Sequence, residues 1–357
     1  MEFGILGLEL SGKTTLFSLL TGHEPAAGHG KPAVHVGIAQ VPDARLDRLS
    51  ALFKPKKHTP ATVRFVDVPG ITKGGSASLN LPELRNMDGL AVVVRSFPSD
   101  AVPHPEGSLG PARDMELVET ELLLNDLSVV ENRMERLARD LAKRRTAELE
   151  AERDALERCR AALEAGTPLR RVDLSADERR LLKGFAFLTL KPMLVVLNAG
   201  EGDAADLAGA IGRAGLAGAA AQPGVAVSAV CATIEQEISR LAPADQAAFL
   251  ADLGLPDRAL DRLLQAAYSL LGLISFFTAG DDECRAWSIP AGTTAVKAAG
   301  VIHSDFERGF IRAEVVPWGE LLEAGSTAAC RPRGTLRLEG KDYVVRDGDV
   351  VEFRFNV

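Results

Sequence analysis

The chain has 357 residues, of which 46% are apolar and 25% charged, the composition of an ordinary globular protein. Its net charge of -8 at pH 7 excludes a general basic field for nucleic acid, so we expect no DNA binding, and any RNA contact has to come from local basic patches. The length favours about two or three domains. The N-terminus has the pattern of a core strand rather than a signal peptide, and no apolar run is long enough to span a bilayer. We therefore expect a cytoplasmic protein that does not contact membranes.

The cysteines lie far apart in the sequence and match no zinc-binding spacing. A chain of this size needs no disulfide framework, so we expect reduced thiols. These residues are Cys159, Cys231, Cys284 and Cys330.

The chain opens with the pattern of a phosphate-binding loop. Residues Gly7–Thr14 spell G-x-x-x-x-G-K-T, between an apolar strand at Phe3–Leu6 and a helix that we expect from Thr15 onward. In such a loop, the two glycines let successive backbone N–H groups turn inward to hold phosphate oxygens. The lysine reaches the β- and γ-phosphates, and the threonine hydroxyl binds Mg²⁺. The predicted nucleotide-binding residues of this loop are Leu10, Ser11, Gly12, Lys13, Thr14 and Thr15.

A second element of a phosphate site is the sequence D-V-P-G at Asp67–Gly70, at the end of an apolar strand. We predict that Asp67 and Thr14 hold Mg²⁺ and that the Gly70 N–H contacts the γ-phosphate, so that Lys13 and Gly70 are the catalytic groups. The next residue is Ile71, where Ras-type enzymes carry the glutamine that orients the attacking water. An isoleucine cannot do this, which favours slow hydrolysis or another group in that role.

A helical segment interrupts the nucleotide-binding pattern. Residues 113–189 are rich in Leu, Glu, Arg and Ala, with apolar residues at helical spacing, which predicts an inserted antiparallel helical hairpin. A core strand then returns and ends in N-A-G-E at Asn198–Glu201, where GTPases carry N-K-x-D. The Asp of that motif accepts two hydrogen bonds from guanine, a contact that the longer arm of Glu201 fits poorly. We predict that the nucleotide base lies against Asn198, Glu201, Cys231, Ala232 and Thr233.

Residues 277–357 have a different sequence pattern, which predicts short strands and one helix at Thr294–Ala299. The pair Asp347-Gly348 between alternating runs predicts a β-hairpin. The predicted fold class is therefore α/β: a P-loop NTPase domain of GTPase-like fold, with an inserted helical hairpin and a C-terminal module close to the ubiquitin-like β-grasp. The predicted boundaries are 1–112 and 190–276 for the two parts of the nucleotide-binding domain, 113–189 for the insertion and 277–357 for the C-terminal module.

This order of elements resembles the YchF-type Obg-like ATPases, P-loop NTPases that end in a TGS domain. The resemblance covers nearly the whole chain and is densest in the C-terminal module, at Phe276–Gly280, Ala299–Ile311 and Phe353–Val357. It implies a preference for ATP over GTP, slow hydrolysis and association with ribosomes. The chain departs from the family pattern at Glu9 and Leu10, where the loop usually carries Pro and Asn, and in residues 31–37, which lack the switch threonine.

Three interpretations of the function stay open. The first is a slow ATPase that acts as a molecular switch on the ribosome. The second is a nucleotide-binding regulator with little or no hydrolysis, which Ile71 and the missing switch threonine favour. The third is a GTP-binding protein, against which the Glu201 argument stands. Basic residues that could reach ribosomal RNA are Lys54, Lys56, Lys57, Lys143, Arg144, Arg145, Arg331 and Arg333.

Overall fold

The computed structural model describes residues 1–23, 34–71 and 81–356. The described chain forms two compact units: the first comprises Met1–Ile38 and Arg64–Leu270, and the second comprises Ala39–Val63 and Leu271–Val357. The sequence does not predict that residues 39–63 group with the C-terminal residues. Of the segment that lacks the switch threonine, residues 31–33 lie outside the described part.

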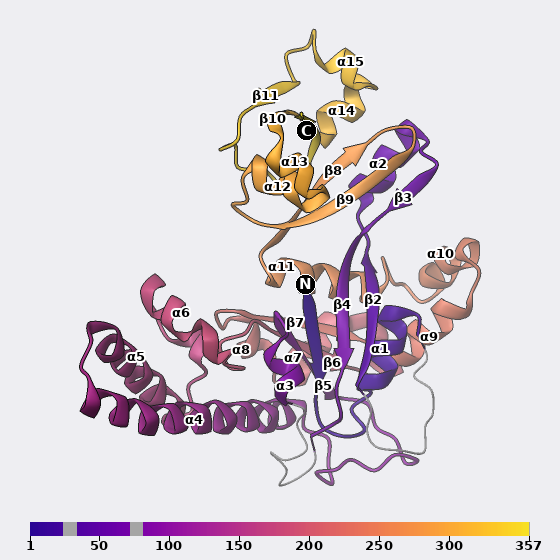
Figure 1. Ribbon diagram of the computed structural model, residues 1–357. Helices are drawn as coiled ribbons and strands as arrows, with labels where there is room; N and C mark the ends of the chain where they lie inside the picture. The colour runs from indigo at the N-terminus through magenta and orange to yellow at the C-terminus, as the bar shows by residue number, and fades with distance from the viewer. Residues whose placement is uncertain (24–33, 72–80, 357) are drawn as a thin grey trace. The chain divides into compact units, whose positions relative to one another are not determined.

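A sheet forms the centre of the first unit (Figure 1), with the order β2-β4-β1-β5-β6-β7. Neighbours from β4 through to β7 pair in parallel, and β1, β5 and β6 are buried along almost their whole length, as strands covered on both faces require. Because these strands are parallel, the loops that follow them gather at one edge of the sheet. The strands are β1 (Glu2–Leu6), β2 (His35–Val41), β4 (Ala61–Asp67), β5 (Gly89–Arg95), β6 (Met193–Asn198) and β7 (Val225–Val230).

Helices surround this sheet. α1 packs against β1 and α9, and α7, α8 and α11 pack against β7. Short 3-10 turns complete the connections, at η2 (Leu169–Arg171), η3 (Lys183–Phe185) and η4 (Glu201–Asp206). The helices are α1 (Lys13–Thr21), α3 (Leu81–Arg85), α7 (Leu207–Arg213), α8 (Ala217–Ala220), α9 (Ala232–Arg240), α10 (Pro243–Asp252) and α11 (Ala259–Leu270).

The inserted helical hairpin extends away from the sheet of the first unit (Figure 1), as α4 (Pro111–Lys143) and α5 (Ala147–Glu164), followed by α6 (Ala176–Leu182). Pro111 starts α4 at a position where its missing N–H costs nothing, and the Thr146 side chain caps α5 by accepting the N–H of Leu149. Their packed residues form a core of their own. Asp126, fully buried in α4, accepts hydrogen bonds from the N–H groups of Leu188 and Thr189, which fastens the hairpin to the chain that returns to the sheet.

The second unit is a mixed sheet with the order β11-β10-β12-β8-β9-β3. Ala295, Ala298 and Ala299 give α12 a small-residue face that lies in the core with Phe276 and Phe353. Its elements are β3 (Lys57–Thr59), β8 (Leu273–Ala279), β9 (Glu283–Pro290), β10 (Phe310–Pro317), β11 (Arg337–Glu339), β12 (Asp349–Phe355), α2 (Ala44–Phe53), α12 (Ala295–Ile302), α13 (Ser304–Arg308), α14 (Trp318–Ala324) and α15 (Thr327–Cys330). Together with the first unit, this sheet confirms the predicted fold class.

The segment 39–63 supplies a helix and an edge strand to the second unit. α2 packs against β8, β9 and α14, and β3 pairs in parallel with β9. On α2, the Arg45 guanidinium bonds to Asp43 and Asp347 and lies 5.2 Å from the ring centroid of Phe277, which is fully buried. The unit is therefore built from two distant parts of the sequence.

Three of the basic residues predicted to reach RNA are engaged within the second unit. Lys56 lies 2.7 Å from Asp282 and Lys57 3.2 Å from Glu283. Arg331 donates to the buried Glu314 at 3.0 Å. Their charges are thus locally matched, which weakens them as a basic patch.

The predicted β-hairpin at Asp347-Gly348 is wrong. Residues 340–348, all described, contain no strand, and β12 pairs instead with β10 and β8. The turn instead forms long-range hydrogen bonds with β8. The Gly348 N–H donates to the Ser275 carbonyl at 2.8 Å, and Asp347 Oδ1 accepts the Ser275 N–H at 2.9 Å. Gly348 has φ 88°, a left-handed conformation that glycine adopts without strain. Tertiary hydrogen bonds to β8 have therefore replaced the local pairing that the pattern indicated.

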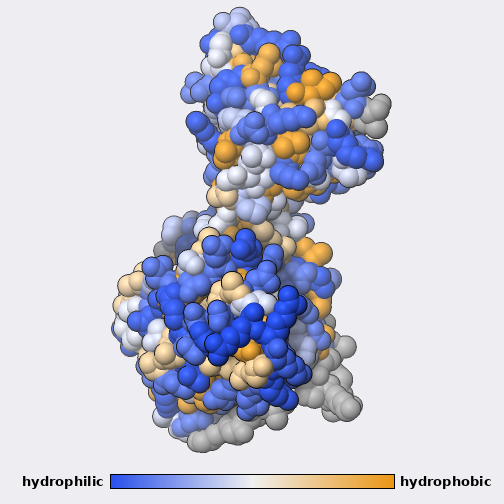
Figure 2. Space-filling view, turned by 60° about the vertical axis from the view of Figure 1, so that its left-hand side comes forward, coloured by the Kyte–Doolittle hydropathy of each residue, from blue (hydrophilic) through white to orange (hydrophobic). Residues whose placement is uncertain are grey.

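The face shown in Figure 2 is mostly hydrophilic, with hydrophobic residues in small groups among hydrophilic ones. In the described part of the chain, no helix combines the length and the hydrophobicity needed to cross a membrane. Cys159, Cys231, Cys284 and Cys330 are all buried thiols.

Candidate functional site

The phosphate-binding loop connects β1 to α1 with a backbone that requires its glycines. Gly7 and Gly12 have φ of 151° and 91°, and a Cβ on Gly12 would lie 2.2 Å from Asn198 Nδ2. Leu10 also has a positive φ, 61°, and is half exposed. No side chain among the described residues caps the N-terminus of α1. The first N–H groups of this helix are therefore available to an anion.

Lys13, Thr14 and Asp67 meet directly after the loop. Thr14 Oγ1 donates to Asp67 Oδ2 at 3.0 Å, and Lys13, only 7% exposed, donates from Nζ to the Leu8 carbonyl at 3.0 Å. Gly70 lies against them, because a Cβ at this position would come within 2.8 Å of Lys13 Nζ. The sequence predicted this grouping, and only glycine fits there without displacing the lysine.

Both charged groups of this cluster are shifted toward their neutral forms. Burial lowers the pKa of Lys13, against the opposing attraction of Asp67 and Glu9. Burial likewise raises the pKa of Asp67, against the hydrogen bond from Thr14 and the charge of Lys13. Burying the charged forms of Lys13 and Asp67 costs free energy. A phosphate beside the lysine and a cation beside the aspartate would each offset this cost, so the cluster favours a ligand that brings both.

The residues present fit Mg²⁺. Among the described residues, Asp67 Oδ1 is buried and accepts no hydrogen bond, and Ser11 Oγ of the phosphate-binding loop is also unpartnered. No group of three or more His, Cys, Asp or Glu side chains that could hold a metal exists in the described part of the chain. Mg²⁺ commonly takes one or two protein oxygens and completes its shell with phosphates and water. Thr14 and Asp67 are the pair of oxygen donors that such an ion needs.

A cavity of about 500 Å³ adjoins the loop. Of the predicted base-binding residues, Asn198, Glu201, Ala232 and Thr233 line it, and Cys231 does not; its buried Sγ lies 3.2 Å from Thr233 Oγ1. Gly12 and Thr15 of the phosphate-binding loop line it too. The cavity therefore continues from the phosphate-binding loop into the region where a nucleoside belongs.

Asn198 ties the two halves of the site together. Its Nδ2 donates to the Ser11 carbonyl at 3.1 Å, and its Oδ1 accepts the Ala232 N–H at 3.4 Å. The side chain is 4% exposed. Asn198 thus holds the phosphate-binding loop and the start of α9 in register, a role that the sequence alone did not indicate.

Sequence reasoning missed part of the cavity wall. Ser96, Phe97 and Pro98 follow β5, Gly202 and Asp203 lie in η4 after β6, and Gln236 lies on α9 after β7. A usable signal existed, since any loop that follows a parallel strand reaches the same edge of the sheet. The sequence does not show which side chains of such a loop face the cavity, because that depends on how the loop folds.

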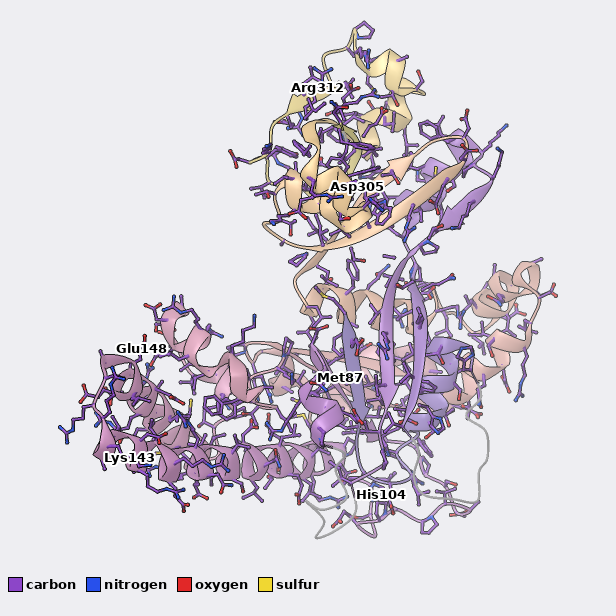
Figure 3. The ribbon with its side chains drawn as sticks, in the orientation of Figure 1. Met87, His104, Lys143, Glu148, Asp305 and Arg312 are labelled. Atoms are coloured by element: carbon purple, nitrogen blue, oxygen red, sulfur yellow. The ribbon has the colours of Figure 1, made fainter. Side chains whose placement is uncertain are left out.

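The loop after β5 is anchored by His104, a partly buried residue that the sequence did not single out. Figure 3 shows His104 in the chain below the sheet, and its Nε2 lies 3.0 Å from Asp114 Oδ2. The Glu106 N–H donates to Nδ1 at 3.2 Å, so the proton is on Nε2 and is donated to Asp114. Arg113 donates to the other carboxylate oxygen at 2.8 Å. These bonds fix the far end of the loop that lines the cavity.

A glycine loop and buried aspartate at one end, and a nucleoside-sized cavity at the other, lie at the carboxyl ends of the parallel strands. This is the arrangement of P-loop NTPases, and the chain has their GTPase-like fold.

Comparisons with known proteins place the chain more narrowly. The family model YchF-GTPase_C, described as a protein of unknown function (DUF933), matches residues 273–356. The chain is 42% identical to the Ribosome-binding ATPase YchF of Bacillus subtilis and 38% identical to that of Escherichia coli O157:H7, and each alignment covers 99% of both chains. The structure of the Schizosaccharomyces pombe YchF GTPase matches with a TM-score of 0.84 at 30% identity, over 99% of this chain and 97% of that one. The chain belongs to the YchF family.

Proposed function

We propose that this protein binds ATP with Mg²⁺ and hydrolyses it slowly, as a cytoplasmic molecular switch that associates with ribosomes. The observation that carries the proposal is the buried cluster of Lys13, Thr14 and Asp67 beside a cavity large enough for a nucleoside. In the proposed complex, the N–H groups from Leu10 to Thr15 and Lys13 hold the phosphates. Thr14 and Asp67 hold Mg²⁺, which neutralises charge on the phosphates, and the Gly70 N–H contacts the γ-phosphate.

The preference for ATP rests on the end of β6. Glu201 lines the cavity at the position where GTPases carry the aspartate that binds guanine. A longer carboxylate reaches the two guanine donors in a poorer geometry, so guanine loses the contact that selects it. The proposed base site is completed by Asn198, Ala232 and Thr233, which line the cavity, and by Cys231. Cys231 does not line the cavity, and its Sγ contacts Thr233 Oγ1.

Ile71 supports the proposal of slow hydrolysis, unless another group orients the attacking water. This side chain is 4% exposed, and its N–H donates to the Gly7 carbonyl at 3.0 Å, which holds it against the phosphate-binding loop. A hydrocarbon side chain cannot orient a water molecule. The same observation favours the second candidate function, a nucleotide-dependent regulator with little or no hydrolysis.

Association with ribosomes is proposed from the relatives, whose names call them ribosome-binding ATPases. The surface that we propose for ribosome binding is the end of the helical hairpin, where Lys143, Arg144 and Arg145 are exposed. Figure 3 shows Lys143 and Glu148 at this far end. A few cations on an acidic protein give a binding that weakens steeply with salt.

Phosphate release from ATP, measured with and without added ribosomes, tests the proposal against a Lys13→Ala variant. We expect slow turnover by the unaltered protein, a faster rate with ribosomes, and no turnover by the variant, because the lysine contacts the β- and γ-phosphates. ATP binding without turnover above that of Lys13→Ala would favour the regulator instead. Tighter binding of GTP than of ATP would favour a GTP-binding protein, in line with the S. pombe relative, which is called a GTPase.

A further inference from the structure

Arg95, the last residue of β5, is a buried cation whose side-chain hydrogen bonds, among the described residues, go to the loop that follows the strand. The residue is only 2% exposed. Its Nε donates to the Phe97 carbonyl at 3.0 Å, and its Nη2 donates to the Val102 carbonyl at 2.9 Å. The guanidinium carbon lies 4.4 Å from the centroid of the Phe97 ring. Among the described residues, no carboxylate forms an ion pair with Arg95, and its Nη1 has no hydrogen-bond partner.

A charge buried without a counter-ion is costly, so its retention points to a geometric role. The planar guanidinium presents several donors in a fixed fork and stacks on aromatic faces, which a lysine or an apolar residue cannot do at once. Here the fork binds the carbonyls of Phe97 and Val102, five residues apart, while its face covers the ring of Phe97 itself. The chain from Ser96 to Val102 is therefore drawn back over Arg95.

The other side of this loop faces the cavity. Ser96, Phe97 and Pro98 line it together with the loop that starts at Asn198. The Ser96 N–H donates to the Asn198 carbonyl at 2.9 Å, and a Cβ built on Gly200 would lie 3.6 Å from Cβ of Phe97. The position of Phe97 thus sets the distance between the loop after β5 and the loop after β6, which form two walls of the cavity.

We propose that Arg95 is a positioning residue for the nucleotide base: it fixes Phe97 and Pro98 as a preformed wall of the base cavity without touching the nucleotide. This inference rests on the proposed nucleotide-binding function and extends it to a residue outside the binding motifs. A wall that is ordered before binding spares the entropy of ordering it, and a fixed aromatic ring offers a stacking surface. Among the described residues, the side-chain hydrogen bonds of Arg95 go to Phe97 and Val102 and not to the phosphate-binding loop.

Titration with two probes separates the base site from the phosphate site. A non-hydrolysable ATP analogue needs both, and inorganic tripolyphosphate needs the phosphate site alone, each with Mg²⁺. In Arg95→Met, we expect the Kd of the analogue to rise about tenfold, roughly the loss of one base–aromatic stack, and the Kd of tripolyphosphate to stay unchanged. Arg170→Met is the matched control: Arg170 is also buried, at 8% exposed, but it bonds to Glu119 and the Thr189 carbonyl, away from the cavity. The control should bind both probes as the unaltered protein does.

Arg95→Lys keeps the charge and guards against a variant that fails to fold. It cannot span both carbonyls and cover the ring, so we expect the same selective loss of analogue binding with little change in thermal midpoint. Unchanged analogue binding in either variant would overturn the inference, as would an equal loss of both probes, because the whole site would then have collapsed. No analogue binding by the unaltered protein would instead overturn the proposed function itself.

Discussion

At the scale of single residues, the proposed phosphate site carries a free-energy cost, because it buries two ionisable side chains. Lys13 and Asp67 are both buried, and burial shifts the pKa of each toward its neutral form. Asp67 Oδ1 has no partner among the described residues. Because both charges are buried and this oxygen lacks a partner there, binding a ligand that brings phosphate and Mg²⁺ should stabilise this site more than one whose polar groups are already paired.

Asp67→Asn should therefore stabilise the nucleotide-free protein while it weakens Mg²⁺-dependent nucleotide binding. Because the pKa of Asp67 is raised on folding, its ionised form destabilises the fold above that pKa, and this cost disappears as the carboxyl becomes protonated at lower pH. We expect the variant's melting midpoint at pH 7 to be higher by about 2–4 °C, the effect of ~1 kcal/mol in a domain of 150–250 residues. The advantage should shrink as pH falls through the raised pKa.

Thermal melts of the two proteins across this pH range, without nucleotide, measure the effect. The Asn side chain still accepts the Thr14 hydrogen bond, so the variant isolates the charge. An advantage that grows toward acid would contradict the assigned direction of the pKa shift. Nucleotide affinity should fall about tenfold or more in the variant, provided that Mg²⁺ is present.

The sequence predicts those site residues whose roles follow from a local pattern. Lys13, Thr14 and Asp67 sit in short motifs at strand ends, where backbone geometry and chemistry are set within a few residues. The bridging role of Asn198 and the cavity wall at Phe97 depend on contacts between chain segments about 100 residues or more apart, as the Asn198–Ser11 separation of 187 illustrates. No local pattern encodes such contacts.

At the scale of elements, α2 completes the second unit. Leu46 and Leu49 are fully or almost fully buried on this helix, and the Arg45 guanidinium lies over Phe277 of β8. The Asp43 side chain caps the helix by accepting the Arg45 N–H at 3.0 Å. We infer that α2 is part of the core of the second unit.

Leu49→Ala should destabilise the second unit by about 2–5 kcal/mol, the usual cost of deleting a buried leucine side chain. The tryptophans of the chain, Trp287 and Trp318, both lie in this unit, so their fluorescence during chemical denaturation reports its unfolding. Ala51→Ser, on an exposed position of the same helix, is the control and should change little. A midpoint for Leu49→Ala equal to that of the control would show that α2 is not part of this core.

Element prediction succeeded where periodicity was long and failed where pairing was remote. The long helices α4 and α5 and the buried strands of the first unit follow from apolar spacing over many residues. β3 has three residues and starts at the end of a basic run, and only its pairing with β9 makes it a strand. The Asp347-Gly348 turn has hairpin chemistry, but its hydrogen bonds go to Ser275 of β8.

At the scale of the whole molecule, charge distribution limits where a partner can bind. The net charge is -8, and of the basic residues considered for RNA contact, Lys56, Lys57 and Arg331 are in ion pairs. The exposed cations at the end of the α4–α5 hairpin are therefore the surface that best suits a polyanion. The sequence alone could not show that Lys56 and Lys57, though exposed, lie in ion pairs.

The central claim is that the site selects ATP through the loop that begins at Asn198. Calorimetric titration of non-hydrolysable ATP and GTP analogues into the purified protein with Mg²⁺ tests it most directly. We expect the ATP analogue to bind at least about tenfold more tightly, a difference of about 1.4 kcal/mol, and Glu201→Asp to narrow that ratio by restoring the shorter carboxylate. Equal or tighter binding of the GTP analogue by the unaltered protein would contradict the account.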